Sequence, residues 1–259
     1  MIDAGVTILV PTSPIPSHPE LGVIEQALHS VRTHLPNART IIMADGVRQE
    51  QQLSHASRYS VYLDRLDEKI REKAKPYNHT ELHFFHTFHH QAAMTSHILN
   101  RVTTPLVLFL EHDTFFLPNL YIDWPGIAQV LLSGEANLVN FHCQWEPWII
   151  PEHEPLMLDK TRKYYFRVPM IRTFQWSQRP HLARTDFYRQ IMRSFFTPTS
   201  RTFIEDRVHP AVLLDRAANG DQAWENWRLM YYAPYENGTI RRTWTSDGRE
   251  SDPKYDCQF

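Results

Sequence analysis

Two carboxylates stand at the end of a strongly apolar stretch of this chain. Residues 105–110 read PLVLFL, and Glu111, His112 and Asp113 follow directly. In an extended chain, side chains two positions apart point to the same side, so Glu111 and Asp113 face one region. Two close carboxylates repel each other unless a cation lies between them, and hard cations such as Mg²⁺ and Mn²⁺ take oxygen ligands while keeping places for water and phosphate. The pair therefore predicts a site for a metal ion and a diphosphate, against the alternative of an acidic turn in solvent.

The elements that precede the acidic pair predict a mostly parallel sheet. Strands are expected at residues 6–11, 38–45, 81–86 and 105–110. Helices are expected at 17–35, with Ser17 as its cap, and at 90–102, and a helix or a pair of helices is expected at 49–75. This alternation requires crossover connections, and ligands of such α/β sheets bind beyond the carboxyl ends of the strands. Thr12 and Ser13 follow the first predicted strand and Asp45 ends the second, so we expect them at the same sheet edge as the acidic pair.

The second half of the chain has a less regular pattern, which predicts further strands mixed with helices. Strands are expected at 137–145, 164–176 and 227–235, and helices at 185–196, capped by Thr185, and within 202–220. No repeat and no Gly- or Ser-rich linker divides the sequence, so we expect one domain over residues 1–259.

The composition argues against several classes of protein. Lys and Arg total 27 and Asp and Glu total 29, which gives no support for a surface that binds nucleic acid. With 8 glycines in 259 residues, a glycine-rich phosphate loop is not expected. Cys143 and Cys257 are predicted to be free thiols in a reducing compartment. Because we see neither a signal peptide nor an apolar run long enough for a transmembrane segment, we expect a cytoplasmic protein.

Several motifs together resemble the GT-A fold nucleotide-sugar glycosyltransferases, especially the inverting family 2. PLVLFLEHDTFF resembles the strand that carries the Asp-x-Asp motif of that family, with Glu111 in place of its first Asp. VTILVPTSP and TIIMADGVR are similar to the first and second strands of the family, and FIEDRVHPAVLLDRA is similar to its Glu-Asp helix start. The motifs occur in the family's order and cover roughly residues 5–220. The resemblance implies a nucleotide-sugar-binding half at about 5–115, an acceptor-binding half at about 116–240 and a tail at 241–259.

The resemblance also implies roles for individual residues. Asp206 is the expected general base, with Glu205 positioning the acceptor or serving as the rival base, and Asp113 with Glu111 would hold Mn²⁺ or Mg²⁺. One sugar would pass from a nucleotide diphosphate, UDP being favoured, to a hydroxyl of a glycan or glycoconjugate, with inversion. The expected donor-binding residues are Pro11, Thr12, Ser13, Asp45, Arg48, Glu111, His112 and Asp113.

Some features depart from the family and leave alternatives open. Met94 and His97 stand where family members often place Arg and Gly, and the signature of processive members is not evident. Two rival classes are a metal-dependent phosphohydrolase or nucleotidyltransferase, and a non-catalytic module that binds nucleotide sugars. The sequence does not decide whether the tail folds over the site.

Aromatic and histidine-rich stretches complete the set of candidates. Trp145 and Trp148 lie in a proline-rich stretch, where tryptophan faces could stack on an acceptor sugar or pack into the core. The stretch HFFHTFHH at 83–90 lacks the spacing and thiols of a structural zinc site, so we expect its rings to line a pocket edge.

Overall fold

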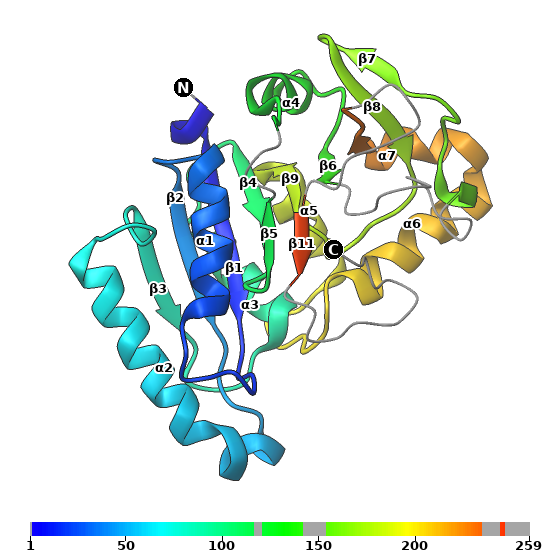
Figure 1. The fold of residues 1–259 in the computed structure, drawn as a ribbon. Helices are drawn as coiled ribbons and strands as arrows, with labels where there is room; N and C mark the ends of the chain where they lie inside the picture. Colours follow the sequence, from blue (N-terminus) through cyan, green and yellow to red (C-terminus); the bar gives the residue numbers. More distant parts are fainter. Residues whose placement is uncertain (1, 117–120, 142–153, 235–243, 247–259) are drawn as a thin grey trace.

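A sheet of nine strands is the central element of the fold (Figure 1). The structure, a computed structural model, describes residues 2–116, 121–141, 154–234 and 244–246. The nine strands are β1 (Val6–Thr12), β2 (Arg39–Ala44), β3 (Thr80–Phe84), β4 (Leu106–Phe109), β6 (Leu138–Phe141), β7 (Lys163–Tyr165), β8 (Val168–Thr173), β9 (His181–Arg184) and β10 (Leu229–Tyr232). Their order across the sheet is β3-β2-β1-β4-β9-β6-β10-β8-β7.

The amino-terminal half of the sheet is parallel, which confirms the sequence prediction. β1 pairs in parallel with β2 and β4, and β2 pairs in parallel with β3. Thr12, Ala44 and Phe84 lie in one row across β1, β2 and β3, while Phe109 of β4 lies opposite Leu9. The carboxyl ends of these strands therefore share one edge of the sheet, where the polar residues that follow them are brought together.

The carboxyl-terminal half of the sheet is mixed, as expected. β9 is antiparallel to both β4 and β6, and β10 is parallel to β6 but antiparallel to β8. β7 and β8 form an antiparallel hairpin, and a separate pair joins β5 (Thr114–Phe116) to β11 (Trp244–Ser246).

Helices cover both faces of the sheet, with α1 in front and α3 behind in Figure 1. All seven residues of β1 and all four of β4 are buried, as expected for strands covered on both faces. The α-helices are α1 (Gly22–His34), α2 (Gln52–Glu72), α3 (His90–Leu99), α4 (Trp124–Leu132), α5 (Thr185–Phe195), α6 (Glu205–Asn219) and α7 (Trp224–Trp227). The 3₁₀ turns are η1 (Ile2–Gly5), η2 (Gln49–Gln51), η3 (Glu154–Leu156) and η4 (Gly220–Ala223).

Three local predictions were wrong. Helix α1 begins at Gly22 rather than after Ser17, because His18 is 2 % exposed and its ring stacks on Tyr62 at 3.9 Å, which holds the preceding turn away from the helix. Thr185 is the first residue of α5 and not its cap. The strand predicted at 164–176 is the β7–β8 hairpin, because the chain reverses at residues 166–167, both of which have positive φ angles.

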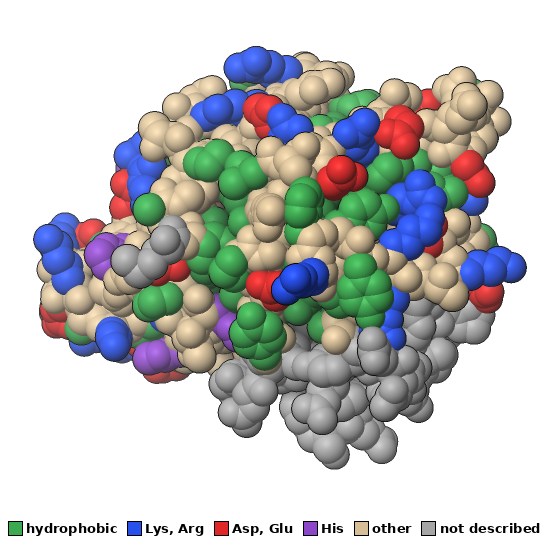
Figure 2. All heavy atoms as spheres, turned by 90° about the horizontal axis from the view of Figure 1, so that it is seen from above, with side chains coloured by type: hydrophobic (Ala, Val, Ile, Leu, Met, Phe, Trp, Pro, Cys, Tyr) green, Lys and Arg blue, Asp and Glu red, His purple; other side chains and the backbone are tan. Residues whose placement is uncertain are grey.

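The two halves of the chain share one apolar core. The largest buried cluster includes side chains from β1 through β10, with Trp176 among its fully buried residues. On the face drawn in Figure 2, Lys and Arg side chains are interspersed with Asp and Glu, and neither sign forms an extended patch. Within the described ranges, no helix is long and apolar enough to cross a lipid bilayer.

Candidate active site

The acidic turn lies where the sequence placed it, at the end of β4. The amide of Leu110 donates to the Leu9 carbonyl at 3.0 Å, so the chain keeps its pairing with β1 up to the turn. The backbone amide and the hydroxyl of Thr114 both donate to the carbonyl of Glu111, at 3.1 and 3.0 Å. His112 Nδ1 lies 3.2 Å from the carbonyl oxygen of Pro11. These contacts fix the turn against the end of β1 and leave Glu111 and Asp113 partly exposed.

The last strand of the chain returns to this turn. In β11, Ser246 pairs with Thr114, which directly follows Asp113 (Figure 1). A stretch of the predicted tail thus lies beside the acidic turn, which the sequence had left undecided.

A buried glutamine, Gln91, connects the acidic turn to the start of α6. Gln91 is 5 % exposed and lies in the first turn of α3. Its Nε2 donates to Glu111 Oε1 at 3.3 Å, and its Oε1 accepts from the Ile204 amide at 3.1 Å. Gln178 completes the network, because its amide nitrogen donates to Gln91 Oε1 at 3.0 Å while its oxygen accepts from the amides of Ile204 and Glu205 at 2.9 Å each.

The two acidic residues at the start of α6 have different surroundings. Glu205 Oε2 accepts from the Gln178 backbone amide at 2.8 Å, and burial raises the pKa of its carboxyl group. Asp206 is exposed, and its Oδ2 accepts from the Thr202 hydroxyl at 2.9 Å. Negative charge is favoured at a helix amino terminus, which stabilises both carboxylates there. The network therefore fixes Glu205 and leaves Asp206 accessible from the solvent side.

Asp45 lies at the end of β2, as predicted, but its carboxylate faces backbone amides. Oδ1 accepts from Gly46 and His89 at 2.8 and 2.7 Å, and Oδ2 accepts from His90 at 2.9 Å. The residue is 2 % exposed, and this burial raises the pKa of its carboxyl group even though the three amides lower it. Asp45 thus holds the start of α3 against β2, while its contact with a nucleobase stays a prediction.

Two arginines lie around one phenylalanine beside this loop. The guanidinium of Arg48 lies 4.8 Å from the centre of the Phe88 ring, and that of Arg201 lies 5.9 Å from it. Burial lowers the pKa of the neighbouring His90, whose Nδ1 accepts from the Gln91 amide at 2.9 Å. The neutral ring and the two guanidinium groups make this rim suited to an anionic ligand.

The remaining donor-site candidates lie at the end of β1. Thr12 is 2 % exposed, and its hydroxyl lies 3.4 Å from the hydroxyl of Tyr62, while Pro11 is buried and Ser13 is partly exposed. The structure thus brings Pro11, Thr12, Ser13 and the acidic turn to one edge. Trp145 and Trp148, predicted to bind the acceptor, lie outside the described residues.

The donor atoms at the acidic turn fit a hard divalent cation that also binds a diphosphate. Glu111 and Asp113 offer carboxylate oxygens, which Mg²⁺ and Mn²⁺ prefer. Among the described residues, no group of three or more His, Cys, Asp or Glu side chains could hold a metal by itself. Two carboxylates therefore need further oxygen ligands, as water and phosphate supply in open magnesium sites.

Sequence reasoning missed Gln91, Gln178 and Arg201. Gln91 did carry a usable signal, since it follows the third strand of a parallel sheet and opens a helix. Gln178 and Arg201 lie in irregular segments of the second half, and no local pattern marks them.

Comparison with known proteins gives matches in structure only. No family model and no curated protein matches the sequence. S. aureus TarS residues 1–349 in complex with UDP-GlcNAc matches 98 % of this chain and 61 % of that chain, with 12 % identity and a TM-score of 0.54. The longer S. aureus TarS structure matches 93 % of this chain and 36 % of its own, with 12 % identity and a TM-score of 0.53.

A second kind of protein gives a match of similar quality. GalNAc-T7 with UDP, GalNAc and Mn²⁺ matches 88 % of this chain and 41 % of that chain, with 10 % identity and a TM-score of 0.52. The chain therefore spans between 36 and 61 % of the lengths of these three structures. At such identities the likeness establishes the fold, and it agrees with the resemblance noted in the sequence. The chain has the GT-A fold of nucleotide-sugar glycosyltransferases.

Proposed function

We propose that this chain transfers one sugar from a nucleotide diphosphate sugar to a hydroxyl group of a glycan or glycoconjugate. The observation that carries the proposal is the hydrogen-bonded connection from Glu111 through Gln91 and Gln178 to Glu205. It joins a carboxylate suited to a metal–diphosphate to the acidic start of α6. A transferase must hold the leaving diphosphate and activate the acceptor hydroxyl in one site, because the two groups lie on opposite sides of the anomeric carbon of the donor sugar.

The two acidic residues of the turn would act on the leaving group. Glu111 and Asp113 would hold Mn²⁺ or Mg²⁺, which neutralises the charge that develops on the departing diphosphate. Arg48, whose guanidinium lies over the Phe88 ring, would add positive charge to the rim. Pro11, Thr12 and Ser13 would contact the nucleotide at the end of β1.

Asp206 is the residue that we assign as the general base. A base must reach the acceptor hydroxyl, and Asp206 is exposed whereas Glu205 is engaged by the Gln178 amide. Asp206 would take the hydroxyl proton as the acceptor oxygen attacks the anomeric carbon and the bond to the diphosphate breaks. One direct displacement of this kind inverts the anomeric configuration. Glu205 would keep the start of α6 in place.

The structural neighbours support the same donor class. S. aureus TarS was solved with UDP-GlcNAc, and GalNAc-T7 was solved with UDP, GalNAc and Mn²⁺. Their ligands favour a UDP-sugar donor and a divalent cation for this chain as well.

Nucleotide binding is the first test of the proposal. Calorimetry would compare UDP, GDP and dTDP, each with Mn²⁺ and with EDTA, on the wild type and on Asp113→Ala. We expect one diphosphate to bind in a metal-dependent manner and the variant to lose that binding. Asp221→Ala, an exposed carboxylate in η4 beyond the far end of α6, is the matched control and should bind normally. Absence of binding by all three nucleotides would refute the proposed donor site.

The assignment of the base has its own test. With a donor and acceptor found by screening, Asp206→Asn should lower the transfer rate by about 10²–10⁴-fold, the usual contribution of a general base. Its nucleotide affinity should stay within a few-fold of the wild type, because Asp206 lies outside the acidic turn. Glu205→Gln keeps an acceptor for the Gln178 amide and should lose less activity. Near-normal transfer by Asp206→Asn would remove Asp206 from the role of base. A wild type that binds the donor but transfers no sugar would favour a non-catalytic module.

A further inference from the structure

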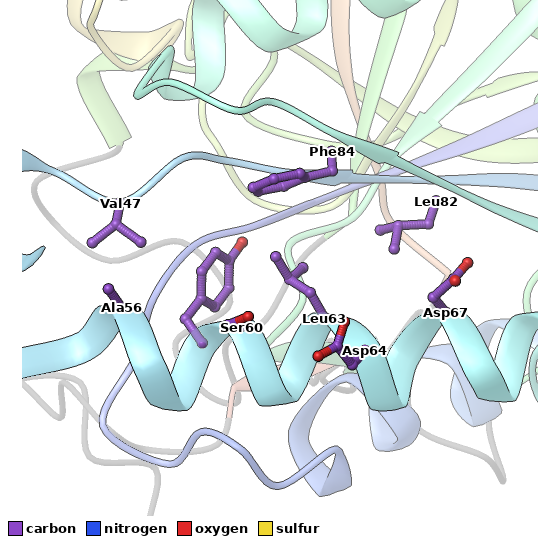
Figure 3. Close-up of a pocket in the computed structure, with 9 residues that line it drawn as sticks. Val47, Ala56, Ser60, Leu63, Asp64, Asp67, Leu82 and Phe84 are labelled. Atoms are coloured by element: carbon purple, nitrogen blue, oxygen red, sulfur yellow. The ribbon is translucent and has the colours of Figure 1, made fainter.

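A pocket lies between α2 and the edge strand β3 (Figure 3). Its volume is about 420 Å³, within the range of small-molecule sites. The residues that line it are Val47, Ala56, Tyr59, Ser60, Leu63, Asp64, Asp67, Leu82 and Phe84.

Five of the nine residues that line this α2–β3 pocket are apolar. In Figure 3, Val47 and Ala56 lie at one end, Leu63 and Leu82 face each other further along, and Phe84 lies across from the helix. None of these five side chains is fully buried, and Phe84 is 36 % exposed. A surface of this kind favours the body of an apolar ligand.

Tyr59 gives the pocket an unsatisfied polar group. The residue is 1 % exposed, and its ring lies beside the stacked pair of His18 and Tyr62, with ring centres 5.1 and 5.7 Å away. Its hydroxyl is buried and has no hydrogen-bond partner among the residues that the structure describes. Buried hydroxyl groups are almost always paired, so an unpaired one in the wall of a pocket points to a partner supplied by a ligand.

The other end of the pocket is acidic. Asp64 is exposed and forms no ion pair within the described ranges, whereas Asp67 is paired with Arg71. Asp64 follows Tyr59 by five residues on α2, which separates the two positions by about 7.5 Å along the helix axis. Both residues line the pocket, so a ligand that spans the apolar walls would meet Tyr59 with one end and the Asp64 carboxylate with the other.

We propose that the α2–β3 pocket binds a small organic cation, with an apolar body, an ammonium group at the Asp64 end and a hydrogen-bonding group at the Tyr59 end. An anionic ligand of the same shape would meet the repulsion of Asp64, and a purely apolar one would leave the Tyr59 hydroxyl unpaired. This site goes beyond the proposed transfer reaction and does not depend on it.

Four phenyl compounds test the proposal through binding alone. Tyramine carries both end groups, 2-phenylethylamine lacks the hydroxyl, 4-ethylphenol lacks the ammonium, and 3-(4-hydroxyphenyl)propionate replaces the ammonium by a carboxylate. Ligand-observed NMR titration should give millimolar binding for tyramine, weaker binding for the two compounds that lack one group, and none for the anion. No binding of tyramine, or equal binding of the anion, would overturn the proposal.

Variants of the two ends make the test specific. Tyr59→Phe should weaken tyramine by about five-fold, as loss of one hydrogen bond predicts, and leave 2-phenylethylamine unchanged. Asp64→Asn should weaken both amines by about three- to five-fold and leave 4-ethylphenol unchanged. Glu68→Gln, one turn further along α2 and outside the pocket lining, is the matched charge control and should change nothing. Equal responses of the amines to Tyr59→Phe, or of Asp64→Asn and Glu68→Gln, would place the binding elsewhere and overturn the assignment. Because no nucleotide enters this assay, its failure would leave the proposed transferase untouched.

Discussion

Replacement of Gln91 by leucine tests the network that joins the acidic turn to α6. The side chain is 5 % exposed, donates to Glu111 and accepts from Ile204 and Gln178. Leucine is of similar size, so a large cavity is not expected, but it can replace none of these hydrogen bonds. A net hydrogen bond contributes about 1 kcal/mol, and a buried group left unpaired costs about 1–3 kcal/mol. We therefore expect Gln91→Leu to lower the free energy of unfolding by about 3 kcal/mol, and the Tm by roughly 6–12 °C.

Urea unfolding followed by tryptophan fluorescence would measure this loss. Gln129→Leu is the matched control, because Gln129 is exposed on α4 and should change stability by less than about 0.5 kcal/mol. The m-value should stay constant, since the surface exposed on unfolding does not change. A Gln91→Leu variant as stable as the control would show that the network contributes nothing. A destabilised variant that keeps full metal-dependent nucleotide binding would show that the network stabilises the fold without positioning Glu111.

Two further predictions concern the pH dependence of stability and an ion-pair cluster. Burial lowers the pKa of His181 to about 4, so on acidification the unfolded chain takes up this proton before the folded chain does. Between neutral pH and about pH 4 this difference should lower the free energy of unfolding by about 3 kcal/mol. The pH dependence of stability should be weaker in His181→Gln but unchanged in the control His29→Gln, whose histidine is exposed. Although burial alone would raise the pKa of Asp159, hydrogen bonds from Arg172 and Lys163 hold it at about 2. Asp159→Asn should therefore lower the free energy of unfolding by about 2 kcal/mol at neutral pH, and by progressively less as the pH approaches 2. Thermal unfolding at each pH would measure this difference.

The parallel half of the fold could be predicted because its signal is strong and local. VTILVP and PLVLFL are continuous apolar runs, and strands buried on both faces require such runs. Their alternation with helical segments then determined the edge at which Thr12, Asp45 and the acidic pair meet. Each of these steps depends on neighbouring residues in the sequence.

Helix starts and turns could not be predicted as well, because tertiary contacts decided them. Ser17 and Glu20 have the spacing of a capping box, yet the stacking of His18 on Tyr62 moves the helix start to Gly22. The hairpin reverses at Phe166 and Arg167, neither of which is a usual residue for positive φ. A local sequence pattern gives no information on the ring stacking or on the positive φ angles.

The site network depends on distances along the chain that no local pattern covers. Gln91 and Gln178 are 87 residues apart, and they meet only because β4, β9 and the start of α6 are packed together. The sequence did predict the acidic residues at both ends of the network. It could not predict the two glutamines between them, since a buried amide is recognised by its partners and not by its neighbours.

The capping of α3 and α6 indicates how polar residues at one sheet edge divide their roles. Neither helix is capped by the side chain of its own N-cap residue. Asp45 supplies the acceptor for the start of α3, and Gln178 supplies it for the start of α6. A carboxylate that closes a helix in this way is buried and its oxygens are engaged by amides, so it is poorly placed to take a proton from an acceptor. Asp206 lies at the same helix start as Glu205 but is exposed and has spare acceptor capacity. These two properties are the physical criterion by which we propose Asp206, and not Glu205, as the base.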